Sequence, residues 1–153
     1  MPHTSSRCRS TGAGVPRRIY LIGALKNGAI PDVARRLRSY GHDVFDAWWA
    51  PGPEADKFWQ SYEENQGHSF GVALAQPFSQ HIYAFDKFWL DWADTGVLVM
   101  PAGKSAHLEL GYLLGRGLPG YILLPEEPAD WDQMYNLATG VCYSVDELME
   151  ALD

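Results

Sequence analysis

Short apolar runs alternate along the chain with stretches in which apolar residues recur at helical spacing. A run of four or five apolar, often β-branched residues predicts a buried strand, and apolar residues repeated every three or four positions predict an amphipathic helix. Gly41 is expected to end the first helix, and Ser79 and Ser144 are candidate N-terminal caps, the latter in a capping box with Glu147. The predicted strands are 18–22, 42–45, 97–100, 121–124 and 141–143, and the predicted helices are 30–40, 54–65, 79–94, 104–116 and 144–152.

The alternation of strands and helices predicts the fold class. Residues 18–45 form a β-α-β unit, in which the crossover is right-handed and the two strands pair in parallel. Continued along the chain, this order gives an α/β domain of three layers with a mostly parallel, five-stranded sheet of the flavodoxin-like or Rossmann-like kind. We expect this single domain to span residues 18–153. Residues 1–17 are rich in Ser, Gly and Arg without periodicity, which predicts a disordered leader.

One segment, residues 48–77, has no clear period. Prolines and glycines interrupt it, and aromatic residues are scattered through it. We interpret it as an insertion that covers the crevice beside the sheet as a lid or wall. Its aromatic side chains, including Trp49, would either stack on a planar ligand or pack against the rim of the sheet, and the sequence leaves both open.

The composition narrows the classes of partner. The chain has 153 residues and a net charge of −7, from 12 basic and 19 acidic side chains. Such an acidic protein is not expected to hold a nucleic-acid backbone as its main task, although a small nucleotide needs only local positive charge. No apolar run reaches membrane-spanning length, and two cysteines, Cys8 and Cys142, are too few for a disulfide framework or a metal knuckle. We expect a cytoplasmic protein with no metal and no cofactor.

The stretch Val97–Arg116 carries the first candidate for chemistry. An apolar strand ends at Pro101-Ala102-Gly103 and a helix follows, and open α/β sheets bind ligands at such strand ends. Glu109 lies at the border of the apolar face of this helix. A carboxylate there would be close to the crevice and partly shielded from water. Taken alone, however, a Glu in the first turns of a helix is more often a solvated surface residue.

A second carboxylate stands out in the predicted helix 79–94. When this helix is unrolled, Asp86 falls inside a broad apolar arc that runs from Ile82 to Ala93. A charge that faces the core is costly unless it is paired, hydrogen-bonded or protonated. Asp86 is therefore either a structural, hydrogen-bonded residue or a carboxyl group with a raised pKa that is suited to donating a proton. Two carboxylates in one crevice, one partly wet and one desolvated, suit glycosidic chemistry.

Two other patterns are incomplete. Gly103-Lys104-Ser105 after a strand is similar to the end of a Walker loop, but the position that requires a Gly five residues earlier is Leu98. The backbone N–H groups of this loop would still suit an oxyanion or a sugar hydroxyl. His107-x-Glu109 begins a zinc-deaminase signature, and the Pro-Cys-x-x-Cys part of that signature is absent from the sequence.

Three segments together resemble the nucleoside 2-deoxyribosyltransferase superfamily, which includes the deoxynucleoside 5′-monophosphate N-glycosidases. They are Tyr20-Leu-Ile-Gly23-Ala-Leu-Lys26-Asn27, then Asp86 with Asp94 eight residues later, and Ala106-His107-Leu108-Glu109-Leu110-Gly111-Tyr112. Each segment alone is weak evidence for the family, but the three in this order and spacing are fairly specific for it. The resemblance covers roughly Arg18 to the C-terminus.

The resemblance implies roles for these residues. Glu109 would be the nucleophile that forms a covalent glycosyl-enzyme intermediate, Asp86 would handle the proton at the nucleobase, and Tyr20 would orient the nucleophile. The resemblance also implies a homodimer or larger homo-oligomer whose sites are completed by a neighbouring subunit. The substrate-binding candidates are Gly23, Lys26, Asn27, Trp49, Gly103, Lys104, Ser105 and His107.

One position departs from the family. Six residues before the nucleophile, the transferases commonly carry an acidic residue for the 5′-hydroxyl and the nucleotide branch carries a Ser for the phosphate, whereas this chain has Gly103. Whether the 5′ end of the substrate is free or phosphorylated therefore stays open. Lys26 and Lys104 favour an anionic group.

We predict an enzyme that cleaves the N-glycosidic bond of a nucleoside or its 5′-monophosphate and transfers the sugar to another nucleobase. Three alternatives stay open: a hydrolase that releases free base and sugar phosphate, an NAD glycohydrolase that uses the same kind of glutamate, and a nucleotide-binding module without catalytic activity. The sequence identifies neither the base nor the 2′ substituent.

Overall fold

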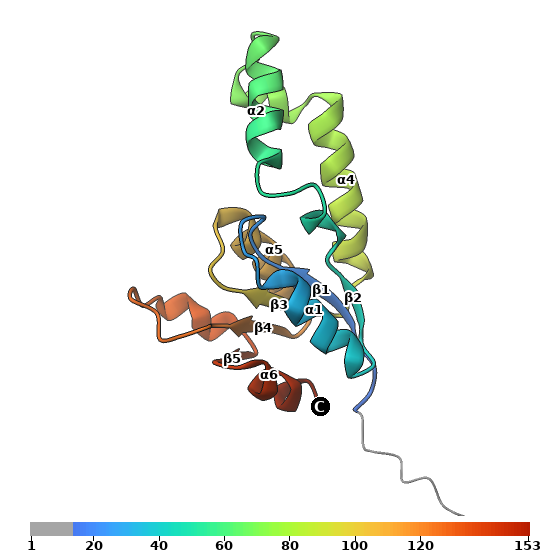
Figure 1. Cartoon of the computed structure of the whole chain (residues 1–153), viewed down its shortest axis with the longest axis vertical. Coiled ribbons are helices and arrows are strands. Elements are labelled where there is room, and N and C mark those ends of the chain that lie inside the picture. The colour runs from blue at the N-terminus through green and yellow to red at the C-terminus, as the bar shows by residue number, and fades with distance from the viewer. Residues whose placement is uncertain (1–13) are drawn as a thin grey trace, which may run out of the picture.

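The computed structural model describes residues 14–153 and shows one sheet at the centre of the molecule (Figure 1). The order of the strands across the sheet is β2-β1-β3-β4-β5, and each neighbouring pair is parallel. The predicted α/β fold with a five-stranded parallel sheet is confirmed. The strands are β1 (Arg18–Ile22), β2 (Asp43–Phe45), β3 (Thr95–Val99), β4 (Gly120–Leu123) and β5 (Gly140–Cys142).

Helices cover both faces of the sheet, which makes the three layers that the alternation predicts. They are α1 (Ile30–Ser39), α2 (Ala55–Asn65), α3 (Phe70–Leu74), α4 (Pro77–Trp92), α5 (Lys104–Gly115) and α6 (Val145–Leu152), with 3-10 turns at η1 (Ala47–Trp49) and η2 (Gln133–Leu137). On one face α1 and α6 pack against Ile19 and Leu21, and on the other the C-terminal end of α4 and helix α5 pack against Tyr20 and Ile22. Successive residues of a strand point to opposite faces, so Tyr20 lies on the side of α4 and α5. Within residues 14–153, none of these helices is long and apolar enough to cross a bilayer.

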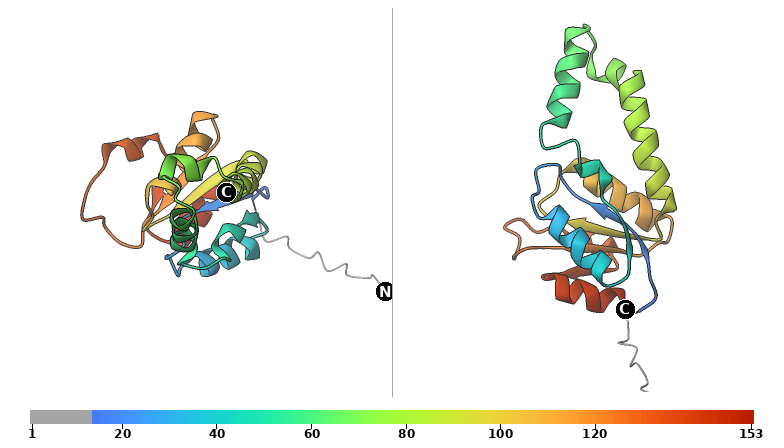
Figure 2. Two further views of the ribbon diagram at one scale, coloured as in Figure 1. Left: turned by 90° about the horizontal axis from the view of Figure 1, so that it is seen from above. Right: turned by 45° about the vertical axis from the view of Figure 1, so that its right-hand side comes forward.

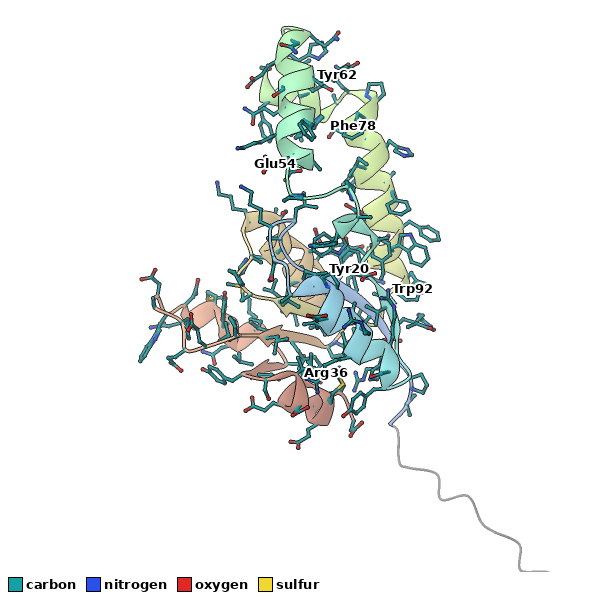
Figure 3. All side chains as sticks on the ribbon, viewed as in Figure 1. Tyr20, Arg36, Glu54, Tyr62, Phe78 and Trp92 are labelled. Atoms are coloured by element: carbon teal, nitrogen blue, oxygen red, sulfur yellow. The ribbon has the colours of Figure 1, made fainter. Side chains whose placement is uncertain are left out.

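The segment after β2 projects from the sheet as a helical arm (Figures 1 and 2). We define the helical arm as residues 55–88, which comprise α2, α3 and all but the last turn of α4. The arm stands up from the carboxyl edge of the sheet (Figure 1), and whether it acts as a lid or as a wall stays a prediction. The C-terminal end of α4 reaches the core through Leu90, and Ala93, which follows the helix, is buried as well. Within the arm, the Phe85 ring packs on Phe45 with ring centroids 5.8 Å apart. Figure 3 shows Tyr62 and Phe78 on the arm and Tyr20 in the body of the protein.

Helix ends follow local chemistry, with one departure from prediction. Gly41 follows α1 with a φ of 95°, the left-handed conformation in which glycine commonly ends a helix. Ser144 caps α6 by accepting a hydrogen bond from the Glu147 N–H, as predicted. α4 begins at Pro77, whose fixed φ suits the first helical position. Ser79 therefore lies inside the helix, and the prediction that it caps α4 is wrong.

Arg17, the residue before the first strand, makes hydrogen bonds to three other parts of the chain. The Arg17 side chain donates hydrogen bonds to the Leu152 carbonyl oxygen at 2.9 Å and to Thr95 Oγ1 at 3.3 Å, and the Arg17 N–H donates to His42 Nδ1 at 3.1 Å. Arg17 thus contacts the folded chain, and the boundary after residue 17 stays a prediction. Most of the predicted leader, residues 1–13, lies outside the described residues.

Candidate active site

The structure brings the three predicted catalytic residues to one face of the sheet. Tyr20 is in the middle of β1, Asp86 is on α4 and Glu109 is on α5, and both helices pack on the face to which Tyr20 points. Glu109 is held there because its helix neighbours Ala106 and Leu110 are buried in the core. The two carboxylates thus come from separate helices to the same side of the sheet.

Burial and a neighbouring charge perturb Glu109. Its pKa is raised from 4.5 to about 7, mainly because the carboxyl group is buried and further because of the nearby charge of Asp86. A hydrogen bond from the Tyr20 hydroxyl acts in the opposite direction, since it stabilises the carboxylate and lowers the pKa. Close to neutral pH, Glu109 therefore exchanges readily between its acid and carboxylate forms.

The pKa of Asp86 is shifted in the same direction. Burial raises its pKa from 3.8 to about 6. Within the described chain no basic side chain forms an ion pair with Asp86, because the adjacent Lys87 pairs with Asp91 at 2.7 Å. Both carboxyl groups are partly buried, and burial is the main cause of both pKa shifts.

Tyr20 is the buried hydrogen-bond donor of this group. Its side chain is 1% exposed, and its ring packs against Phe45 with a centroid distance of 5.1 Å. Burial, followed by the charges of Glu109 and Asp86, raises the pKa of the Tyr20 hydroxyl, which therefore stays protonated. A neutral O–H fixed by packing can orient a carboxylate without taking its proton.

A cavity of about 280 Å³ lies between the loops that follow β1 and β3. These loops leave the carboxyl ends of adjacent parallel strands, the edge at which open α/β sheets bind ligands. Three predicted substrate-binding residues, Lys26, Asn27 and Gly103, line this cavity. Lys104 and Ser105 follow directly in the first turn of α5, and both are exposed.

Two tryptophans hold the loop after β1 in place. The Trp48 indole N–H donates to the Leu21 carbonyl oxygen at 2.7 Å, and the Trp49 indole N–H donates to the Asn27 carbonyl oxygen at 3.1 Å. Trp49, a predicted substrate-binding residue, therefore lies beneath the cavity wall and positions it. Trp48 was not singled out from the sequence, because two adjacent tryptophans in a segment without a period give no sign of which backbone they bind.

The Asn27 side chain ties the two cavity loops together. Its amide N–H₂ group donates to the carbonyl oxygens of Val99 at 3.3 Å and Pro101 at 3.4 Å, and its oxygen accepts from the Ala29 N–H at 3.0 Å. Both donor hydrogens are used inside the protein, and the residue is 8% exposed. Asn27 thus has its clearest role in fixing the shape of the cavity.

Gly23, another predicted substrate-binding residue, has a steric reason for being glycine. A Cβ atom at this position would lie 2.7 Å from Cδ1 of Ile30 and 3.4 Å from the Trp48 ring. Ile30 begins α1 and is completely buried, so it cannot move aside cheaply. Glycine therefore allows the first turn of α1 to pack against the end of β1.

His107 connects α5 to the segment between β4 and β5. Its Nδ1 is 2.7 Å from the Gly103 carbonyl oxygen, its Nε2 is 2.9 Å from the Tyr135 hydroxyl, and the two rings stack with centroids 5.8 Å apart. Both ring nitrogens of His107 are therefore hydrogen-bonded within the protein, and neither is free for the predicted contact with substrate. The partner, Tyr135 in η2, could not be found from the sequence because η2 has no periodic pattern.

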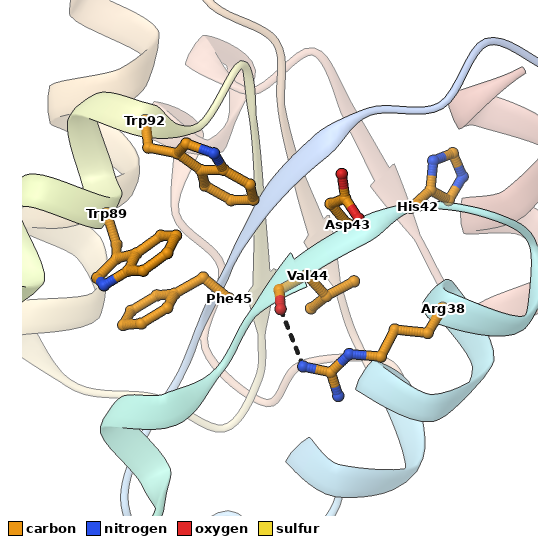
Figure 4. A pocket seen from close by; sticks show the side chains of 7 residues that line it. All are labelled: Arg38, His42, Asp43, Val44, Phe45, Trp89 and Trp92. Atoms are coloured by element: carbon orange, nitrogen blue, oxygen red, sulfur yellow. Dashed lines mark hydrogen bonds between the residues drawn. The ribbon is translucent and has the colours of Figure 1, made fainter.

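A larger cavity, of about 480 Å³, lies at the open edge of β2 (Figure 4). Neither Glu109 nor Asp86 lines it. The Arg38 guanidinium donates to the Val44 carbonyl oxygen at 2.9 Å and pairs with Asp46 at 2.7 Å. This contact covers an edge-strand carbonyl that would otherwise be free to pair with another chain, so we assign this edge a structural role. Across residues 14–153, no three His, Cys, Asp or Glu side chains gather where they could hold a metal ion.

Comparisons with known proteins bear on the fold. No protein-family model and no curated protein matches the sequence. The structure is similar to that of a 2-deoxyribosyltransferase from Bacillus psychrosaccharolyticus, with a TM-score of 0.56 and 16% identity over 86% of this chain and 89% of that one. It is also similar to a conserved protein from Enterococcus faecalis V583, with a TM-score of 0.59 and 15% identity over 90% of this chain and 98% of that one. The resemblance inferred from the three sequence segments is thus confirmed at the level of the fold.

Proposed function

We propose that the chain is a nucleoside 2-deoxyribosyltransferase-like enzyme that cleaves the N-glycosidic bond of a nucleoside or its 5′-monophosphate and transfers the sugar to another nucleobase. The observation that carries the proposal is the interacting pair of carboxylates, Glu109 and Asp86, with the Tyr20 hydroxyl beside them. The fold supports it, because a 2-deoxyribosyltransferase has a similar structure over 89% of its length.

In the first half-reaction, a carboxylate oxygen of Glu109 attacks the anomeric carbon while the bond from that carbon to the base nitrogen breaks. Asp86 gives its proton to the departing base, which leaves as a neutral molecule. Tyr20 orients the Glu109 carboxylate for the attack through its hydrogen bond. The product is a glycosyl ester of Glu109, with Asp86 now ionised.

In the second half-reaction, a ring nitrogen of the acceptor base attacks the anomeric carbon. The acceptor loses its proton to Asp86, and the ester bond to Glu109 breaks, which restores both carboxyl groups to their starting forms. Each displacement inverts the anomeric carbon, so the product keeps the configuration of the substrate.

The pKa values set the expected pH range of this chemistry. The reaction needs one proton on the pair, held by Asp86, with Glu109 ionised. Because the pKa of Glu109 is about 7 and that of Asp86 is about 6, the singly protonated pair is most populated between these values. We expect base release to follow a bell-shaped pH profile with its maximum between pH 6 and 7.

The 5′ end of the sugar would occupy the cavity that Lys26 and Gly103 line. The first turn of α5 has no side-chain cap, so its backbone N–H groups are available to an anion there. Lys26 and Lys104 are exposed cations on the two loops. Together these features favour a 5′-phosphate over a free 5′-hydroxyl, for which Gly103 offers no carboxylate.

Hydrolysis is the second candidate, because neither Glu109 nor Asp86 is completely buried. A water molecule that reaches the glycosyl ester would replace the acceptor base in the second half-reaction, lose its proton to Asp86 and release the free sugar or sugar phosphate.

The proposal is tested by incubating the protein with 2′-deoxynucleosides and their 5′-monophosphates, with and without a free acceptor base. Base exchange that is lost in Glu109→Gln and kept in the exposed control Glu150→Gln supports transfer. Release of base at the same rate without an acceptor supports hydrolysis. Release of nicotinamide from NAD would identify an NAD glycohydrolase, and unchanged substrates that nevertheless bind would identify a non-catalytic binding module.

A further inference from the structure

One side chain, Asp91, connects the two helices that carry the carboxylates. It lies in the last turn of α4 and accepts a hydrogen bond from the Tyr112 hydroxyl of α5. Arg116, which directly follows α5, pairs with the same carboxylate, with Nη1 3.6 Å from Oδ1. Lys87 of α4 pairs with the other oxygen at 2.7 Å. We call these four residues, Lys87, Asp91, Tyr112 and Arg116, the Asp91 network.

The Tyr112 ring holds the two cations of the network. The ring is half-buried against the core between α5 and the sheet. Lys87 Nζ lies 4.7 Å and Arg116 Cζ 5.4 Å from the ring centroid, within the range of about 6 Å at which a cation is attracted to an aromatic face. Hydrogen bonds from Lys87 and Tyr112 lower the pKa of Asp91, so the shared acceptor stays charged. The network is therefore one connected unit with members from both helices.

The apolar contacts of α4 are few for a helix of its length. Leu90 is the buried residue of this helix, and before it along the chain α4 belongs to the helical arm (Figures 1 and 2). Trp89 stacks on Phe45 with ring centroids 5.0 Å apart, and Phe85 packs on the same ring at 5.8 Å. These aromatic contacts are made to β2, at the edge of the sheet. The Asp91 network instead connects α4 to α5.

The network lies close to both carboxylates on the same two helices. α4 precedes β3 and α5 follows it in a parallel sheet, so both helices run in the same direction. Asp91 comes five residues after Asp86, about 7.5 Å along α4. Tyr112 comes three residues after Glu109, about 4.5 Å along α5 and on the same side of that helix. A shift of the helices at the network therefore moves Asp86 relative to Glu109.

We propose that the Asp91 network sets the separation of Asp86 from Glu109, which makes Asp91 and Tyr112 positioning residues for the reaction. This inference rests on the proposed function, in which one carboxylate reaches the anomeric carbon while the other reaches the base. A displacement of about 1 Å in such a site can lower the rate about a hundredfold. Two ionised carboxylates repel each other, so without the network Asp86 is expected to move away from Glu109.

The test measures the effect of Asp86 on Glu109 without any substrate. We define the carboxylate coupling as the pKa of Glu109 with Asp86 present minus its pKa in the Asp86→Asn background. Each pKa is measured by NMR of isotope-labelled glutamate carboxyl groups in the unliganded protein. The coupling is expected to be positive, because the charge of Asp86 raises the pKa of Glu109. Tyr112→Phe keeps the ring and the net charge but removes the hydroxyl, and it should make the coupling smaller.

Tyr121→Phe is the matched control. It also removes one hydroxyl hydrogen bond, to the Ala151 carbonyl oxygen at 3.1 Å, but on the face of the sheet that α1 and α6 cover. It should leave the carboxylate coupling unchanged.

A second variant, Asp91→Ala, covers the case in which the pair between Arg116 and Asp91 alone holds the helices together. This variant removes the shared acceptor and should make the carboxylate coupling smaller. The charge that it removes acts on Glu109 in both backgrounds, so this direct effect cancels from the coupling.

Activity gives the second readout. Tyr112→Phe and Asp91→Ala should each lower kcat for base release about tenfold or more with little change in KM, whereas Tyr121→Phe should not. The proposal would be overturned by a coupling that is absent from wild type, unchanged in both network variants, or equally reduced in Tyr121→Phe. An unchanged kcat in an active variant with reduced coupling would overturn it as well. If the coupling shrinks as expected but no nucleoside or nucleotide is turned over, the network positions the carboxylates and the proposed reaction is refuted.

Discussion

Replacing Glu109 with Gln removes a carboxylate that the fold keeps partly out of water, so the variant should be more stable than the wild type at alkaline pH. The pKa of Glu109 rises from 4.5 to about 7 on folding. The folded protein therefore binds this proton more tightly than the unfolded chain does. The resulting stabilisation is complete below about pH 4.5 and is lost as the pH rises through about 7.

The size of this effect follows from the pKa change. A rise from 4.5 to about 7 corresponds to about 3 kcal/mol of unfolding free energy. For a domain of this length, that free energy corresponds to a difference of about 6–12 °C in melting temperature. Gln has no proton to lose in this range. The melting temperature of Glu109→Gln minus that of the wild type should therefore grow by about this amount between pH 4.5 and pH 8.

The measurement is a series of thermal unfolding curves from pH 4.5 to pH 9 at constant ionic strength, for wild type and Glu109→Gln. Glu150→Gln, on the exposed side of α6, controls for the loss of one negative charge. Because Asp86 is the second cause of the shift, the gain from Glu109→Gln should shrink in an Asp86→Asn background. A difference in melting temperature that stays constant from pH 4.5 to pH 8 would refute the reasoning.

Three further substitutions test the surroundings of the pair. Tyr20→Phe removes a hydrogen bond that lowers the pKa of Glu109. The falling limb of base release against pH, which follows the higher pKa of the pair, should therefore move to higher pH; an unmoved limb would contradict the assigned role of the hydroxyl. Gly23→Ala places a Cβ atom 2.7 Å from Cδ1 of Ile30, so urea titrations should show an unfolding free energy that is lower by about 1–3 kcal/mol. Combining it with Ile30→Val should restore part of that loss. A Gly23→Ala variant as stable as wild type would show that the contact is not tight. His107→Ala removes the contacts to Gly103 and Tyr135, so amide hydrogen exchange in η2 should become faster while exchange in β4 stays unchanged; equal rates in η2 would mean that His107 does not hold that segment.

The strands and the meeting of the two carboxylates could be predicted because both follow from short-range pattern and topology. All five residues of β3 are buried, as expected for a strand covered on both faces. α4 precedes β3 and α5 follows it, and both helices return to the same face of the sheet. A polar residue within the apolar arc of each helix therefore faces the same crevice, which is the position of Asp86 and of Glu109.

The helical arm could not be predicted, because the apolar spacing along a helix does not show whether the sheet packs against that side of the helix. Ile82 and Phe85 were expected to share the buried arc of α4, yet they are 40% and 44% exposed. α4 has 16 residues and is therefore about 24 Å long, whereas the five-residue strands span only about 17 Å. The helix is longer than the sheet can cover, and it meets the core near its C-terminal end at Leu90, so most of its length belongs to the arm.

Long-range polar contacts could not be predicted from the sequence either. Arg17 sits in a polar stretch, and its contacts with Thr95 and Leu152 join parts of the chain that are far apart in sequence. The same holds for the indole N–H groups of Trp48 and Trp49, whose partners are backbone carbonyls.

The most direct test of the central claim is mass spectrometry of protein quenched with acid during turnover of a 2′-deoxynucleoside 5′-monophosphate. The account predicts a peptide that contains Glu109 and carries the added mass of one deoxyribose phosphate, absent in Glu109→Gln. It also predicts that the adduct is lost when an acceptor base is supplied. Turnover without an adduct on Glu109, or an adduct on any other residue, would contradict the account.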